Sequence, residues 1–132
     1  MDRRELIRKL VLNAICDDFE NVDQIILPMV TKDCGDLGIA SPERPEIVSA
    51  LASLVWEGLA KAYDLRNLRN SDPFSGELPG MPPADEVEEN FRTYFYLTQK
   101  GMDVHCSDDP EWPFGDDGEP LPNWHPSRLN QG

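Results

Sequence analysis

The chain has 132 residues, 39% of them apolar, which suits one domain with a modest core. Its 12 basic and 25 acidic residues give a formal net charge of −13, which disfavours nucleic acids and anionic membranes as partners unless the basic residues cluster. The amino-terminal MDRRELIRK is charged where a signal peptide is apolar, and no apolar run approaches the ~20 residues of a membrane span. We therefore expect a soluble cytoplasmic protein that does not contact a membrane.

Few residues suit metal binding or catalysis. Cys16, Cys34 and Cys106 lack the spacing of a disulfide framework, so reduced thiols are the simplest interpretation. His105 is adjacent to Cys106 and His125 lies farther on, but no C-x-x-C or H-x-x-x-H pair is present. The motifs of α/β-hydrolases, zinc proteases, P-loop enzymes and dinucleotide-binding enzymes are also missing. The sequence predicts no metal, no cofactor and no enzymatic activity.

A first helix is expected from Asp2, its cap, to the DDFEN segment, with Glu5 completing a capping box. Its apolar stripe comprises Leu6, Ile7, Leu10, Val11, Ala14 and Ile15. Arg3, Arg4 and Arg8 lie near the amino-terminal end, where the helix dipole disfavours positive charge. They are either surface residues paired with the chain's own carboxylates or contacts for a phosphate or a partner.

A second helix is expected to begin near Asp23. Its inward residues are Ile25, Ile26, Met29 and Val30. Pro28 conflicts with a start at Asp23, because proline removes a backbone hydrogen bond and bends a helix beyond its first turn. A start one turn later removes the conflict and leaves residues 21–25 extended. Gly35 and Gly38 are expected to end the helix.

Residues 45–65 carry the clearest pattern in the chain. One side of a third helix is formed by Ile47, Val48, Leu51, Leu54 and Val55. The preceding SPE segment supplies capping residues, and the regular helix is expected to begin at Pro45. Gly58 ends it, after which Leu59, Tyr63 and Leu65 alternate with the period of a half-buried strand.

Residues 67–90 contain four prolines and two glycines and are expected to form a long irregular loop. The following FRTYFYL segment alternates like a strand. Phe91, Thr93, Phe95 and Leu97 point one way, and Arg92, Tyr94 and Tyr96 the other. We expect it to pair antiparallel with residues 59–66. Thr98 then caps a short helix, QKGMDVH, that Gly101 weakens.

Residues 106–132 form an acidic tail rich in proline and tryptophan. Its five prolines between positions 110 and 126 exclude a helix or a central strand. Trp112, Phe114 and Trp124 are large enough to hold it in an extended path over its own domain or over a neighbouring chain. We take these three aromatic residues as candidate partner contacts.

The pattern of residues 2–105 resembles a winged helix-turn-helix domain, the fold of many small bacterial transcription regulators. The segment EIVSALASLVWEGLAKAYDL is similar to the recognition helix and first wing strand, and YFYLTQKG to the second wing strand and the next helix. The resemblance implies an α+β, mainly helical fold with a three-helix core and a two-stranded wing. The domain would span residues 1–105, with the wing loop at 67–90 and an irregular tail at 106–132.

The resemblance also implies a DNA-binding regulator with the third helix in the major groove and the wing on the DNA backbone or in the minor groove. The outward positions of that helix are Glu46, Ser49, Ala50, Ser53 and Glu57. Arg44, at the entrance to the helix, is then the basic residue able to hydrogen-bond to a guanine in the major groove. The wing loop at 67–90 carries one basic and six acidic residues, so phosphates would be repelled from it.

Two hypotheses follow. The first is a non-enzymatic module for protein interaction or regulation that binds a basic surface or a second copy of the chain. The alternative is a transcription regulator that binds DNA weakly, alone or as a dimer, although its charge disfavours this. The alternative requires one patch formed by Arg3, Arg4, Arg8, Lys9 and Arg44.

Overall fold

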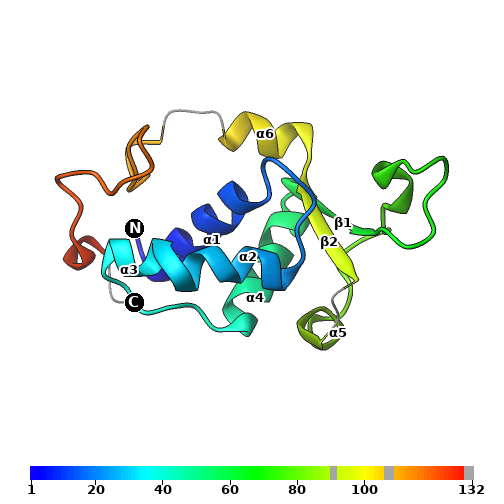
Figure 1. Ribbon diagram of the computed structural model, residues 1–132, viewed down its shortest axis with the longest axis horizontal. Coiled ribbons are helices and arrows are strands. Elements are labelled where there is room, and N and C mark those ends of the chain that lie inside the picture. The colour runs from blue at the N-terminus through cyan, green and yellow to red at the C-terminus, as the bar shows by residue number, and fades with distance from the viewer. Residues whose placement is uncertain (90–91, 106–108, 130–132) are drawn as a thin grey trace.

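The computed structural model describes residues 1–89, 92–105 and 109–129, except for the side chains of residues 88 and 89. Its elements are α1 (Arg3–Ala14), α2 (Val22–Pro28), η1 (Met29–Asp33), α3 (Cys34–Leu37), α4 (Arg44–Trp56), β1 (Ala60–Asp64), η2 (Pro73–Gly76), α5 (Ala84–Glu89), β2 (Thr93–Leu97), α6 (Gln99–His105) and η3 (Pro126–Arg128). The helices pack around one core, and a two-stranded antiparallel sheet lies beside it (Figure 1). An α+β fold with a two-stranded antiparallel sheet is thereby confirmed.

Helix α1 begins where the sequence predicts. The Asp2 carboxylate accepts a hydrogen bond from the Glu5 amide at 2.8 Å, which satisfies one free donor of the first turn. Leu6, Val11 and Ile15 are completely buried, in agreement with the predicted stripe. The helix therefore forms one wall of the core.

The second helix begins close to the start predicted near Asp23, and the alternative start one turn later was wrong. Asn21 caps it and exchanges two hydrogen bonds with Gln24, each of 2.9 Å, so α2 begins at Val22. Pro28 is its last residue, yet the chain stays helical through the π-helical segment η1 and α3. Because proline has no amide to donate, the wider turn that follows it accommodates the missing bond. Gly38, with φ of +70°, ends the helix, whereas Gly35 lies inside it.

Met29 and Val30, the first two residues of the π-helical segment, differ in burial. Met29 is 1% exposed, as predicted, but Val30 was expected inside and is 50% exposed. The buried residues Val22, Ile25 and Met29 keep the α-helical spacing of three and four, and Val30 lies to one side of this stripe. The inward assignment of Val30 was therefore wrong.

Helix α4 contacts α1, α2, α5 and β1. Its first turn is closed by a capping box in which the Glu43 amide donates to Glu46 Oε1 at 3.1 Å. Ile47, Leu51 and Leu54 are completely buried. Because Gly58 adopts a φ of +76°, the chain can turn directly from α4 into β1, as predicted.

The two strands pair in the predicted antiparallel arrangement, with Ala60 opposite Leu97 and Asp64 opposite Thr93. The buried face of β2 also agrees with the prediction, although Phe91 lies outside the described residues. Leu59 and Tyr63 are buried on one face of the strand, as their alternation predicts, and Leu65 is half-buried. Ala60 and Ala62, on the other face, are also buried, so β1 is covered on both sides.

Tyr63 belongs to an aromatic cluster, completed by Phe19, Phe74 and Tyr96, whose ring centroids lie 4.7 to 6.0 Å apart. Both edges of the sheet are also occupied. Glu20 forms a bridge with Phe95 on β2, and the Leu78 amide donates to the Ala62 carbonyl at 2.9 Å on β1. The segment before the hairpin and the long loop within it thus cover edges that would otherwise attract another strand.

The loop predicted at residues 67–90 is not irregular throughout. Pro73–Gly76 form a 3₁₀ turn, and Ala84–Glu89 form helix α5, whose Val87 is completely buried. The prolines before α5 suggested a break, although proline is favourable just ahead of a helix. With two apolar residues among six, Ala84 and Val87, the ADEVEE segment is too short to show a periodicity that would predict a helix.

Helix α6 has the predicted cap, with Thr98 Oγ1 accepting from the Gly101 amide at 3.0 Å. Tail residues 109–129 lie at the end of the molecule opposite the hairpin (Figure 1). They contact their own domain: the Met1 amino group pairs with Glu111 at 3.4 Å, and Trp124 Nε1 donates to the Leu37 carbonyl at 2.8 Å.

Candidate functional site

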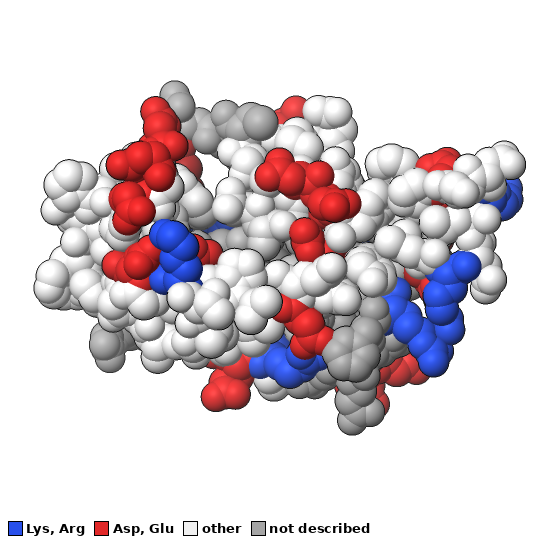
Figure 2. Space-filling view, in the orientation of Figure 1, with Lys and Arg blue, Asp and Glu red and all other residues white. Residues whose placement is uncertain are grey.

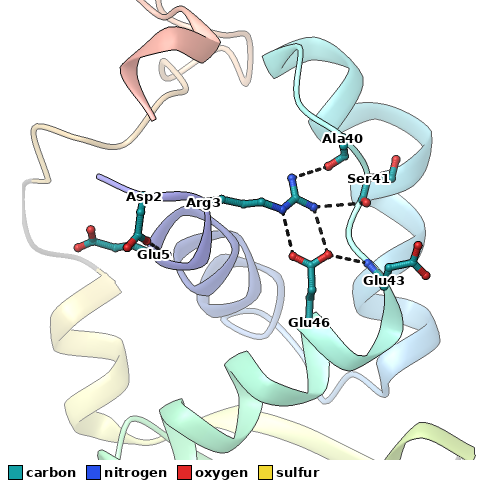
Figure 3. A network of polar contacts seen from close by, with 7 residues as sticks. All are labelled: Asp2, Arg3, Glu5, Ala40, Ser41, Glu43 and Glu46. Carbon is teal, nitrogen blue, oxygen red and sulfur yellow. Dashed lines mark hydrogen bonds and ion pairs between the residues drawn. The ribbon is translucent and has the colours of Figure 1, made fainter. Parts of the chain in front are cut away.

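Arg3, a candidate DNA contact, has its guanidinium directed into the protein's own structure (Figure 3). Two of its nitrogens donate to the Glu46 carboxylate at 3.0 and 3.2 Å. It also donates to the carbonyl of Ala40 at 2.8 Å and to that of Ser41 at 3.4 Å. Arg3 thus connects α1 to the start of α4 and to the segment that precedes it.

This ion pair makes stability depend on pH. The Arg3 guanidinium lowers the pKa of Glu46, although burial partly opposes the shift. A carboxyl with a lowered folded pKa stabilises the protein above its unfolded pKa, and this contribution is lost as the pH falls through the folded pKa. We expect Glu46→Gln to lower the free energy of unfolding at pH 7 by less than about 1 kcal/mol, since both side chains are about one-third exposed. Urea melts at pH 7 and pH 3 measure the difference.

The difference between the wild type and Glu46→Gln should shrink from pH 7 to pH 3, as the pH falls toward and through the lowered pKa of the folded-state glutamate. Glu5→Gln, at an exposed carboxylate of α1, is the matched control and should change little at either pH. A loss in Glu46→Gln of equal size at pH 7 and pH 3 would contradict an electrostatic role for the pair.

Three of the other candidate DNA contacts also form ion pairs with the chain's own carboxylates. These pairs are Arg8 with Glu57, Lys9 with Asp109, and Arg44 with Asp23. Arg4, the fifth candidate, is exposed. Four of the five positive charges are therefore neutralised by nearby carboxylates. This agrees with one of the two interpretations offered from the sequence, that these residues are surface residues paired with the chain's own carboxylates.

The hairpin and its loop show the same pairing. Lys61 lies 2.8 Å from Glu77, and the Arg66 guanidinium, 2.7 Å from Asp64, lowers the pKa of that carboxyl to about 2. Arg92 adds a smaller effect on Asp64. Arg66 and Arg92 lie just outside residues 67–90, so the charge count made for that loop from the sequence did not include them. On the face in Figure 2, basic atoms occur in separate groups rather than as one continuous band.

The outer face of α4 carries the most exposed large apolar side chain among the described residues. Trp56, in the last turn, is 89% exposed. Ser49 is exposed on the same side of the helix, and Ala52 and Ser53 are half-exposed. Ala50, which was expected to point outward, is buried, so that assignment was wrong. We refer to Ser49, Ala52, Ser53 and Trp56 as the α4 face.

Sequence patterns gave no reason to select Trp56. It directly follows the apolar residues of α4, so it reads as a continuation of the core stripe. A helical projection offers the available signal, because Trp56 lies one turn beyond Ala52 and Ser53 and therefore on their side of the helix. A large aromatic side chain with so little cover is a frequent anchor of protein interfaces.

The three aromatic residues chosen as candidate partner contacts help to hold the tail on its own domain, one of the two arrangements expected from the sequence. Trp112, Phe114 and Trp124 are each partly buried and pack against the core. The rings of Trp112 and Phe114 lie 5.6 Å apart. Their contacts with the chain itself leave less aromatic surface for a partner than Trp56 presents.

A groove of about 970 Å³ lies between α1, α6, the end of α4 and the tail. Leu12, Leu54, Leu59, Val104 and Trp112 supply its apolar lining, and Arg8, Lys9 and Lys100 its basic lining. His105 also lines it and bonds Asn13 at 3.0 Å. Among the residues that the structure describes, no group of three or more His, Cys, Asp or Glu is placed to hold a metal ion.

Comparison with protein-family models finds no match, and comparisons with curated proteins and with solved structures find none either. Within the described part of the chain, no helix is long and apolar enough to cross a membrane. A functional assignment must therefore come from the surfaces of the molecule.

Proposed function

We propose that the chain is a winged-helix module that acts through protein contacts, with the α4 face as its docking surface. The order of α1, the α2–α3 segment, α4 and the hairpin supports this assignment. The observation that carries the proposal is the 89% exposure of Trp56 beside uncharged residues. Tryptophan is enriched among the residues that contribute most to protein interfaces, because it buries a large area with little loss of side-chain entropy.

The charges favour a protein partner over DNA. DNA affinity depends largely on cations that neutralise phosphates and release counterions. Arg3 and Arg44, at the amino-terminal end of α4, are paired with Glu46 and Asp23. A duplex would have to displace these carboxylates from their arginines while approaching a chain of net charge −13.

A fluorescence-anisotropy titration with duplex DNA at low salt tests the choice. We expect no saturable binding at micromolar protein. The triple variant Arg3→Ala, Arg4→Ala, Arg8→Ala should behave like the wild type in this titration. The alternative function, a DNA-binding regulator, predicts binding that weakens steeply as salt is added and is lost in the triple variant. That result would overturn the proposal.

Trp56→Ala is the matched variant for the protein-contact side of the test. The purified wild type and Trp56→Ala are each added to an extract of the source cells, cross-linked and analysed by mass spectrometry. We expect cross-links to residues near α4 in the wild type but not in Trp56→Ala. Phe74→Ala, which removes a side chain that is 56% exposed in the hairpin loop, is the control. Equal cross-linking at α4 by all three proteins would contradict a docking role for Trp56.

A further inference from the structure

We infer that the occupant of the α4 face is a second copy of this chain, packed with the two α4 helices antiparallel. The inference rests on the proposed function, because it names the partner of the same surface. Trp56 projects from the last turn of α4, and Ser49, about 10.5 Å away along the helix, lies on the same side. A large side chain and a small one on one helix face are the components of a self-complementary interface.

A two-fold axis near Ala52 and Ser53 exchanges the two ends of the face. It places Trp56 of each copy over Ser49 of the other, with the small residues at the crossing point. Small side chains permit the close interaxial distance of 8–10 Å at which helices pack. Each tryptophan would then be covered, which removes the largest apolar exposure on the described surface.

Charge also favours a second copy at this position. Two molecules of net charge −13 repel each other, so self-association requires a surface without exposed carboxylates. The α4 face has none between Ser49 and Trp56, and the carboxylates that flank it, Glu46 and Glu57, are paired with Arg3 and Arg8. A basic partner would find little negative charge on this face to bind.

Sedimentation equilibrium over a range of concentrations tests the inference. The wild type should approach twice its chain mass of 14.9 kDa, whereas Trp56→Ala and Ser53→Glu should remain at the single-chain mass. Ser53→Glu places two like charges at the crossing point. Leu27→Ala, at another exposed apolar position, should associate like the wild type. Circular dichroism should show that every variant is folded.

Salt separates self-association from DNA binding. Added salt screens the repulsion between two acidic copies, so the dimer should strengthen with salt, opposite in sign to a DNA complex. Ser53→Cys adds a geometric check, because the two-fold axis brings these positions close enough for an oxidative cross-link between copies. Ser75→Cys, in the hairpin loop, should give no such cross-link.

The possible outcomes are distinct. A wild type that stays at the single-chain mass up to millimolar concentration would overturn the self-association and leave the proposed function to be judged by the DNA and cross-linking tests. A wild-type dimer that persists in Trp56→Ala and Ser53→Glu would show that another surface makes the contact and would also overturn the inference. Saturable DNA binding would overturn the proposed function itself.

Discussion

Replacing Leu51 with alanine should lower the free energy of unfolding by about 2–5 kcal/mol, the range for truncating a buried leucine. Leu51 is 0% exposed and lies at the middle of α4, which packs against α1, α2, α5 and β1. Leu54→Ala should fall in the lower half of that range. Leu54 is equally buried but adjoins the groove between α1 and α6, so the space it leaves can open to solvent. Urea denaturation at one fixed protein concentration measures both losses.

Ser49→Ala provides the control, since Ser49 is exposed on the opposite side of the same helix. It should change stability by no more than about 0.5 kcal/mol. If Leu51→Ala were as mild as Ser49→Ala, the buried and exposed sides of α4 would be interchanged. The α4 face would then be part of the core and unavailable to a partner.

Features that depend on nearby residues were predicted well from the sequence. The apolar spacing of α4 and the glycine at position 58 determine a helix that ends in a turn, and both act within a few residues. The alternation of β2 and the cap at Thr98 are equally local. These elements were sufficient to predict the antiparallel hairpin.

Features that depend on distant residues were not predictable. Arg3 and Glu46 are 43 positions apart, and Lys9 and Asp109 are 100 apart, so no local pattern pairs them. The burial of Tyr63 on β1 depends on Phe19, which precedes the hairpin, and on Phe74, which lies in its long loop. The candidate site was missed for a related reason, because the exposure of Trp56 depends on which neighbours fail to cover the last turn of α4.

Gly101→Ala should also destabilise the protein strongly, by about 3 kcal/mol, although helix propensity alone predicts a gain of about 1 kcal/mol. Gly101 lies in α6, which the sequence suggested it would weaken. A Cβ atom at this position would lie 1.9 Å from the Leu59 carbonyl oxygen and 3.2 Å from Leu97 Cδ2. The Leu59 carbonyl already accepts from the Thr98 amide at 3.0 Å, so neither backbone segment can move without breaking that bond. Thermal and urea melts measure the loss.

Gly35→Ala is the matched control, because Gly35 also lies inside a helix, α3, but a Cβ there meets nothing within 4 Å. It should stabilise the protein by about 0.4–1 kcal/mol, through the lower entropy of the unfolded chain. The two substitutions are chemically identical, so their opposite signs isolate the close approach of α6 to the start of β1. A gain in both variants would mean that α6 does not rest on the hairpin, and Lys100 would then lose its position beside the carboxyl end of α4.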